Sequence, residues 1–279
     1  MGNEPRSEPA LDVALNPFPA GELVHIAHGS LVVDIAPLAG GRVAQIARDG
    51  EPWLVGQDDG YAAMIAWGSY PMLPWVGRIR RGRFDFDEHS YQLPLNLGGH
   101  AIHGVGFSMP WSVDAHSSTH VDLSLALPED RRWPFGGVAR QRIEVAKNRL
   151  RMDLSVKAGA LAMPAAIGWH PWFRKPDSID FNPEKVYSRD AEGIVVHPLL
   201  APPLGPWDDC FVNYQPVLIH RGQQTLRLTS DCRKWVVYDE PAHATCIEPQ
   251  TGPPDSFNLE PMRLAPGASL AAWFMLEWL

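Results

Sequence analysis

Residues 141–156 read QRIEVAKNRLRMDLSV, and polar and apolar residues alternate on both sides of Lys147-Asn148. A period of two residues places successive side chains on opposite faces of a β-strand. We therefore interpret this stretch as two antiparallel strands joined at the Lys147-Asn148 pair. A hairpin of this length indicates a protein built from antiparallel sheet.

Similar alternating or β-branched runs recur along the rest of the chain. Turn-forming pairs such as Asp49-Gly50, Gly98-Gly99 and Gly136-Gly137 separate them, and 24 Gly and 27 Pro leave few windows for a helix. We predict an all-β fold, either a large antiparallel β-sandwich or a barrel. The other predicted strands are residues 31–35, 84–93, 121–126, 225–229 and 235–238.

The length of 279 residues is compatible with one domain, because large β-sandwiches often reach this size without splitting. Neither a repeat nor a low-complexity linker divides the chain, so we expect a single domain over residues 21–279. Residues 1–20 contain early prolines and charges, and we expect them to form a loosely ordered arm.

Composition narrows the class of protein. A formal net charge of −8 argues against a nucleic-acid partner, since phosphate binding requires clustered Lys and Arg. Three widely spaced cysteines without a CxxC pair suggest neither a disulfide framework nor a zinc site. No stretch approaches about 18 consecutive apolar residues, and the N-terminus lacks the apolar core of a signal peptide. We expect a soluble cytoplasmic protein without membrane contact.

Familiar cofactor motifs are missing from the sequence. It has no phosphate-binding loop, no dinucleotide fingerprint, no G-x-S-x-G elbow and no H-E-x-x-H helix. His100 and His103 form an H-x-x-H pair, but no acidic or Cys ligand adjoins them, so a metal site is only weakly indicated. We expect neither a metal nor another cofactor.

Two motifs offer candidates for acid–base chemistry. Residues 168–173, GWHPWF, set His170 between two tryptophans and before a proline that fixes the backbone. An imidazole can act as a general acid near neutral pH, although a histidine among aromatic residues is more often structural. In residues 246–258, CIEPQTGPPDSFN, Glu248 follows an apolar strand and fits a base or an acceptor for loop amides. Asp255 has the context of a turn stabiliser.

Arginines and tryptophans near these motifs allow two interpretations each. In residues 74–84, PWVGRIRRGRF, alternation predicts that Arg78 and Arg80 share one face. Either both belong to a solvated, charged strand, or one of them donates hydrogen bonds to a sugar oxygen or a phosphate. Trp169 and Trp172 are candidates for packing against the C–H face of a sugar, although a tryptophan is more often a core residue.

Five segments resemble those of the aldose 1-epimerase (galactose mutarotase) family and follow one another in the family's order. The match spans most of the chain and implies a large antiparallel β-sandwich of the galactose mutarotase-like supersandwich type. It also implies a small-molecule aldose as substrate and no metal or redox cofactor. The segments are PMLPWVGRIRRGRF from residue 71, HAIHGVGFSMPW from 100, GWHPWF from 168, DDCF from 208 and IEPQTGPPDSFN from 247.

The resemblance implies a role for each matching residue. Glu248 would remove the proton of the anomeric hydroxyl while His170 protonates the ring oxygen, so that the ring opens, C1–C2 rotates and the opposite anomer closes. His103 and Arg78 would bond to the ring oxygen and hydroxyls, and Asp208 to further hydroxyls. At neutral pH we expect an ionised glutamate and a protonated histidine.

Other parts of the resemblance leave alternatives open. Asp209 adjoins Asp208 and is the counterpart if the loop register shifts by one residue, and the resemblance places Trp169, Trp172 and Phe107 at the pocket. Gly77 stands where many family members have Asn. The cluster of Arg78, Arg80, Arg81 and Arg83 keeps a hexose-6-phosphate epimerase as an alternative.

Two rival functions belong to other classes. A non-catalytic carbohydrate-binding protein on the same fold would bind sugars and leave anomer interconversion at its spontaneous rate. A glycosidase using Glu248 with Asp208 would release reducing sugar from a glycoside.

Overall fold

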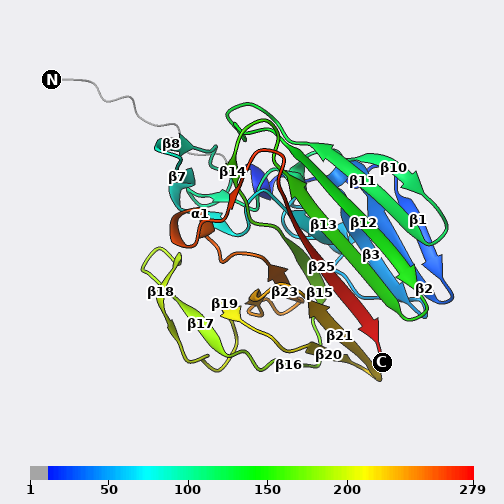
Figure 1. Cartoon of the computed structure of the whole chain (residues 1–279). Helices are drawn as coiled ribbons and strands as arrows, with labels where there is room; N and C mark the ends of the chain where they lie inside the picture. The colour runs from blue at the N-terminus through cyan, green and yellow to red at the C-terminus, as the bar shows by residue number, and fades with distance from the viewer. Residues whose placement is uncertain (1–11) are drawn as a thin grey trace.

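Two large antiparallel sheets dominate the computed structural model, which describes residues 12–279 (Figure 1). The antiparallel pairing of their strands and the packing of one sheet on the other confirm the predicted all-β antiparallel sandwich. In spatial order, the larger sheet contains β1 (Val24–His28), β2 (Leu31–Ala36), β3 (Arg42–Arg48), β5 (Ser69–Met72), β15 (Gly168–Arg174), β23 (Ala244–Gln250), β22 (Lys234–Tyr238), β19 (Asp208–Val212), β17 (Lys185–Arg189) and β18 (Val195–Leu200), and β4 (Glu51–Pro52) pairs with β3.

The smaller sheet covers one face of the larger one, and Figure 1 shows four of its strands, β11, β12, β13 and β25, side by side. Its spatial order is β10 (Ser112–His116), β11 (His120–Ala126), β12 (Val138–Ala146), β13 (Arg149–Lys157), β25 (Ser269–Trp278), β21 (Gln224–Ser230), β20 (Val217–Arg221) and β16 (Ser178–Asp180).

Short elements connect and cover the two sheets. Among the residues that the structure describes, the α-helix α1 (Ser256–Leu259) is four residues long, and no helix is long and apolar enough to cross a membrane. The strand pairs are β6 (Arg78–Ile79) with β9 (Ala101–Ile102), β7 (Arg83–Phe86) with β8 (His89–Gln92), and β14 (Met163–Pro164) with β24 (Arg263–Leu264). Turns of 3₁₀-helix lie at Val13–Leu15, Pro37–Ala39, Gln57–Asp59, Arg80–Gly82 and Gly106–Ser108.

The hairpin predicted around Lys147-Asn148 is present as β12 and β13, which pair from Val138↔Lys157 to Ala146↔Arg149. The predicted strand over residues 84–93 is wrong in one respect, because it is a hairpin of two shorter strands. Asp87 and Glu88 have positive φ values of 44° and 66°, the left-handed backbone of a tight two-residue turn. Alternation continues through both arms, so the sequence pattern alone conceals the reversal.

The core lies between the two sheets. From the larger sheet, Trp169 and Trp235 approach Phe274 of β25, with ring centroids 5.8 Å and 6.1 Å apart. Because side chains alternate along a strand, the intervening residues of β15 and β23 face away from the smaller sheet. Both strands are buried at nearly every position, so the outer face must also be covered, and loops cover it.

The described part of the N-terminal arm is attached to the domain. The backbone N–H of Ala14 donates to Asn96 O at 3.1 Å, and Met64 N–H donates to Asn16 O at 2.9 Å. Ala14 is fully buried. These backbone bonds hold the segment around Ala14 and Asn16 against the loops. Residues 1–11, which belong to the expected loosely ordered arm, lie outside the described part of the chain.

Candidate active site

Two rows of side chains cross the outer face of the larger sheet. Trp172 of β15 lies opposite Cys246 of β23, so in this antiparallel pair His170 lies opposite Glu248. Directly opposed residues point to the same face, which lets each row continue across neighbouring strands. The first row is Tyr70, His170, Glu248, Val236 and Cys210, and the second is Trp172, Cys246, Tyr238 and Asp208.

A pocket of about 360 Å³ lies over these rows. Its volume is within the range of small-molecule sites. The whole first row lines it, and from the second row Trp172, Tyr238 and Asp208 do so. The covering loops contribute Arg78, His103, Ile194 and Pro254, together with Leu15 of the N-terminal segment.

His170 and Glu248 form a close pair on the floor of this pocket. The Nε2 atom of His170 lies 3.3 Å from Oε1 of Glu248, and both side chains are almost fully buried. Burial raises the pKa of Glu248 well above its usual value, and the charge of Asp208 raises it further, whereas the charge of Arg78 lowers it. Burial also lowers the pKa of His170 to about 3.

These pKa shifts correct the expected protonation of the pair in the unliganded pocket. We expected an ionised glutamate and a protonated histidine, but burial disfavours both charges. The neutral pair and the ion pair hold the same number of protons. One proton moved from Glu248 to His170 converts the first form into the second, so the two forms differ by a single proton transfer between these side chains.

Stacked rings hold the imidazole of His170. The ring of Tyr70 lies 4.8 Å from it at an interplanar angle of 28°, and the ring of Trp172 lies 5.4 Å from it at 19°. The Nδ1 atom of His170 has no hydrogen-bond partner within residues 12–279. Ring packing, rather than the usual hydrogen bond to a carboxylate or carbonyl, therefore sets the orientation of this imidazole.

Trp172 lines the pocket, but its ring faces are occupied. His170 covers it from one side, and the ring of His243 is stacked 6.2 Å away at 10°. His243 precedes Ala244, which pairs with Arg174 beyond Trp172, so it approaches from the side opposite His170. Trp172 therefore presents an edge to the pocket, and the expected packing of its face on a sugar does not occur in this arrangement.

Two other aromatic residues do not line the pocket, contrary to expectation. Trp169 is fully buried and packs against Phe274 between the sheets, because it adjoins His170 on the strand and so faces the opposite side. Phe107 is buried behind the pocket wall, with its ring 5.5 Å from Tyr70 and 6.0 Å from His103. It supports two lining residues from outside the cavity.

His103 and Arg78 converge on the pair from the covering loops. His103 adopts a left-handed backbone with φ of 63°, and its N–H donates to Gly77 O at 2.9 Å. Its ring meets that of His170 edge to face at 4.9 Å, and burial, with the charges of His170 and Arg78, lowers its pKa well below the usual value. The Arg78 side chain forms no hydrogen bond or ion pair with the rest of residues 12–279, which leaves its donors free for a ligand.

The strand register distinguishes Asp208 from Asp209. Asp208 lies opposite Tyr238 in the second row and therefore faces the pocket. Asp209 lies opposite Val237, which is buried between the sheets, so it leaves the strand on the other side at the pocket rim. Arg189 joins the two carboxylates, with Nη1 3.0 Å from Asp208 Oδ2 and Nε 3.2 Å from Asp209 Oδ1.

The remaining arginines of the PWVGRIRRGRF segment lie outside the pocket. The prediction that Arg78 and Arg80 share a face is wrong, because β6 ends at Ile79 and a 3₁₀ turn follows. His100 also lies outside, where its Nδ1 accepts a hydrogen bond from the backbone of Arg81 at 3.1 Å. The polar partners are Asp190 and Glu192 for Arg80, Glu192 for Arg81, and Gln92 for Arg83.

Packing explains why a glycine occupies position 77. Gly77 has a φ of 55°, and a Cβ there would lie 2.6 Å from Cβ of Pro254. The loop that carries Pro254 is fixed by Asp255, whose Oδ1 accepts from the backbone of Arg80 at 2.9 Å. The side chain of Asp255 therefore fastens its loop to a segment distant in the chain, and the loop occupies the space that a side chain at position 77 would need.

Several lining residues were not predicted from the sequence. Tyr70, Tyr238, Arg189 and Glu240 line the pocket, although none lies in a segment interpreted above as carrying acid–base chemistry. The two tyrosines are found only through strand register, which joins segments distant in the chain. Tyr70 directly precedes the PMLPWVGRIRRGRF segment, and this proximity is the one sequence signal for it.

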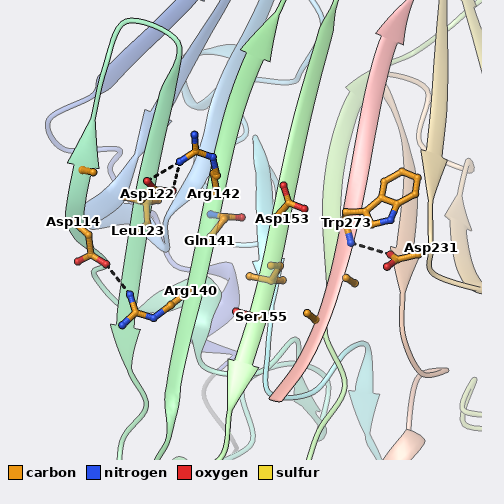
Figure 2. A pocket seen from close by; sticks show the side chains of 14 residues that line it. Asp114, Asp122, Leu123, Arg140, Gln141, Arg142, Asp153, Ser155, Asp231 and Trp273 are labelled. Carbon is orange, nitrogen blue, oxygen red and sulfur yellow. Dashed lines mark hydrogen bonds and ion pairs between the residues drawn. The ribbon is translucent and has the colours of Figure 1, made fainter. Parts of the chain in front are cut away.

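A larger hollow, of about 580 Å³, lies on the outer face of the smaller sheet. Figure 2 shows two ion pairs across it, Asp114 with Arg140 at 3.3 Å and Asp122 with Arg142 at 2.8 Å. No histidine is among the described residues that line it. Four aspartates and two arginines are among the residues that line it, and both arginines are held in these ion pairs. Without a histidine beside its carboxylates, the hollow offers no acid–base pair comparable to His170 and Glu248.

Comparisons with known proteins agree with this architecture. The chain is 33% identical over 156 residues to the uncharacterised protein YphB of Escherichia coli K12, an alignment covering 53% of this chain and 50% of YphB. It is 28% identical over 106 residues to YihR of the same organism, covering 36% of this chain and 34% of YihR. The alignments thus span half or less of the curated relatives.

Solved structures show the same fold. Galactose 1-epimerase from Lactobacillus acidophilus matches with a TM-score of 0.77 at 17% identity, covering 92% of this chain and 94% of that one. A GalM/aldose epimerase homologue from C. elegans matches with a TM-score of 0.79 at 17% identity, covering 92% and 98%. A sequence profile described as Aldose 1-epimerase matches residues 22–276. The chain belongs to the aldose 1-epimerase family.

Proposed function

We propose that this protein interconverts the α and β anomers of a non-phosphorylated aldose without a cofactor, with Glu248 as base and His170 as acid. The observation that carries the proposal is the cross-strand pair on the pocket floor, whose nitrogen and oxygen atoms lie 3.3 Å apart. A base and an acid this close can reach both oxygens attached to C1 of a pyranose, the anomeric hydroxyl and the ring oxygen, at the same time. Positioned acid–base groups contribute about 10² to 10⁴ in rate each.

The reaction begins with a proton transfer inside the pair. Glu248 passes its proton to His170, and the positive charge of Arg78 favours the resulting carboxylate. The carboxylate takes the proton of the anomeric hydroxyl, His170 gives its proton to the ring oxygen, and the C1–O5 bond breaks. Rotation about C1–C2 and reversal of both transfers close the other anomer, so the enzyme ends with the protons it began with.

The charge of the pocket favours a neutral sugar over a sugar phosphate. Of the four arginines that kept a phosphosugar open, Arg78 alone lines the pocket, and the other three have protein partners outside it. A dianionic phosphate would meet more carboxylates than guanidinium groups, and like charges repel strongly where water is excluded. The charged lining residues are Asp208, Asp209, Glu240 and Glu248 against Arg78 and Arg189.

Polarimetry tests the proposal. Freshly dissolved α-D-glucose and α-D-galactose should reach anomeric equilibrium faster with the wild-type protein, and Glu248→Gln at equal concentration should lose most of that acceleration. Acceleration confined to glucose 6-phosphate would instead support the phosphosugar alternative. Sugar binding without any acceleration would support a non-catalytic binding protein, and release of reducing sugar from an aryl glycoside would support a glycosidase.

A further inference from the structure

A thiol lies beside the proposed acid–base pair and has no part in the proposed reaction. Cys246 precedes Glu248 by two residues on β23, so both side chains point to the same face of the sheet. His170, Cys246 and Glu248 each offer one ligand atom, and these three atoms lie within 4.8 Å of one another. All three residues are buried, which distinguishes them from a chance cluster of surface acids.

The chemistry of these three groups matches that of zinc ligands. Zn²⁺ binds Cys sulfur at about 2.3 Å and His nitrogen or carboxylate oxygen at about 2.0–2.2 Å, usually in a tetrahedron. Ligand atoms of such a site are therefore roughly 3.3–3.8 Å apart. The nitrogen and oxygen of His170 and Glu248 already meet this spacing at 3.3 Å. The three ligand atoms lie within 4.8 Å of one another, so a shift of the sulfur on the order of 1 Å completes a three-ligand set.

The position of Cys246 determines how a metal would enter. Its cross-strand neighbours are Trp172 on one side and Tyr238 on the other, and their rings meet edge to face at 6.1 Å. Trp172, Tyr238, His170 and Glu248 line the pocket, whereas Cys246 does not. A metal would thus reach the thiol from the pocket through the acid–base pair, and its fourth coordination position would face the pocket.

We propose that His170, Cys246 and Glu248 form an inhibitory binding site for Zn²⁺. Binding would release the thiol proton, and the carboxyl proton where Glu248 holds it, to solvent. The metal would occupy the lone pairs of His170 and Glu248 that transfer protons to and from a sugar. The proposed zinc binding does not depend on the proposed function. The proposed inhibition does, because it requires that the protein interconverts anomers.

Two measurements on the full chain separate these claims. After EDTA treatment and removal of the chelator, isothermal titration with ZnCl₂ should show one site per chain, weakened by high concentrations of the aldose that the protein accelerates. Co²⁺ in place of Zn²⁺ should produce a thiolate-to-cobalt charge-transfer band in the near ultraviolet. Polarimetry should show loss of the metal-free rate as Zn²⁺ is added. A chain that never accelerates anomer exchange yet binds Zn²⁺ would refute the proposed function alone.

Cysteine variants test the ligand set. Cys246→Ser should lower zinc affinity by at least about tenfold and abolish the cobalt band, because a hydroxyl is a poor zinc ligand. Cys232→Ser, a buried thiol elsewhere in the chain, should retain both. Each variant's zinc sensitivity is compared with its own metal-free rate.

Three results would overturn the site. The first is the absence of zinc binding and of a cobalt band in the wild type, a measurement that does not depend on how the variants fold. The second is Cys246→Ser that binds Zn²⁺ as tightly as the wild type. The third is loss of binding in Cys210→Ser alone, which would assign the metal to the other thiol of the pocket floor.

Discussion

His170 Nε2 lies 3.3 Å from Glu248 Oε1, although the two residues belong to different strands, β15 and β23, that are distant in the chain. Their contact follows from register: Trp172 is paired with Cys246, and two steps along each strand bring the histidine opposite the glutamate. The backbone of two central strands thus fixes the pair. A shift of either strand by one residue would turn its member of the pair to the other face and separate the two side chains.

Variants of the pair should be strongly non-additive. Glu248→Gln and His170→Asn should each lower kcat by about 10² to 10⁴, since either change interrupts the coupled proton transfers. The double variant should be little slower than the slower single variant, because groups that act as a unit are lost together. Polarimetric rates of the three proteins test this. If the factors by which the two single substitutions lower kcat multiply in the double variant, the residues act independently.

The pH dependence of kcat/KM should shift in opposite directions when two charges of the pocket are removed. Arg78 lowers the pKa of Glu248, so Arg78→Met should raise that pKa. The pair must hold one proton to react, so ionisation of Glu248 beside a neutral His170 sets the basic limb, and Arg78→Met should move that limb to higher pH. Asp208 raises the same pKa, so Asp208→Asn should move the basic limb to lower pH.

Arg80→Met is the matched control for this experiment, because Arg80 lies outside the pocket and pairs with Asp190. It should leave the basic limb in place. Shifts of the same sign in Arg78→Met and Asp208→Asn would show that the limb does not report the ionisation of Glu248.

Ring stacking should matter to turnover more than to sugar binding. Trp172→Leu removes one of the two rings that hold His170 and should lower kcat about tenfold or more with a smaller change in KM, because misplaced groups react slowly. Trp172→Phe keeps a ring against the imidazole and should recover most of the rate. Trp207→Leu, which removes a ring packed on Phe181 away from the pocket, is the control. Equal losses in the Leu and Phe variants would contradict the stacking role.

The space at Gly77 should not accept a side chain. Gly77→Ala places a Cβ 2.6 Å from Cβ of Pro254 in a left-handed backbone, and we expect a loss of about 2–4 kcal/mol in the free energy of unfolding. Gly50→Ala is a suitable control, since its φ of 83° imposes similar strain with no atom within 4 Å of the added carbon. Urea unfolding measures both. Equal losses would assign the effect to backbone strain alone.

A buried arginine should be essential to the stability of the pocket wall. Arg42→Met leaves unpaired the buried carbonyls to which the guanidinium donates, and should lower the free energy of unfolding by roughly 3–5 kcal/mol. Arg140→Met, an exposed arginine paired with Asp114, should lower it by less than about 1 kcal/mol. In urea unfolding, the loss of free energy of unfolding should be several times larger for Arg42→Met than for Arg140→Met. The carbonyls that accept from Arg42 belong to Ala39, Met64, Trp67 and Phe107.

Much of this protein could be predicted from local sequence. The alternation in residues 141–156 predicts the hairpin of β12 and β13, because successive side chains of a strand point to opposite faces and polar and apolar residues therefore alternate. The motifs around His170 and Glu248 identify the pair and the family.

Only the tertiary structure decided which face of each strand became the pocket. Alternation states that Trp169 and Trp172 point to opposite sides, but packing against Phe274 selects the side that becomes core. Long-range contacts likewise pair Arg80 with Asp190 and leave Arg78 free. Burial, which exists only in the folded chain, disfavours the charged forms of both Glu248 and His170. A sequence encodes local periodicity, whereas register, burial and ion pairing depend on residues that folding brings together.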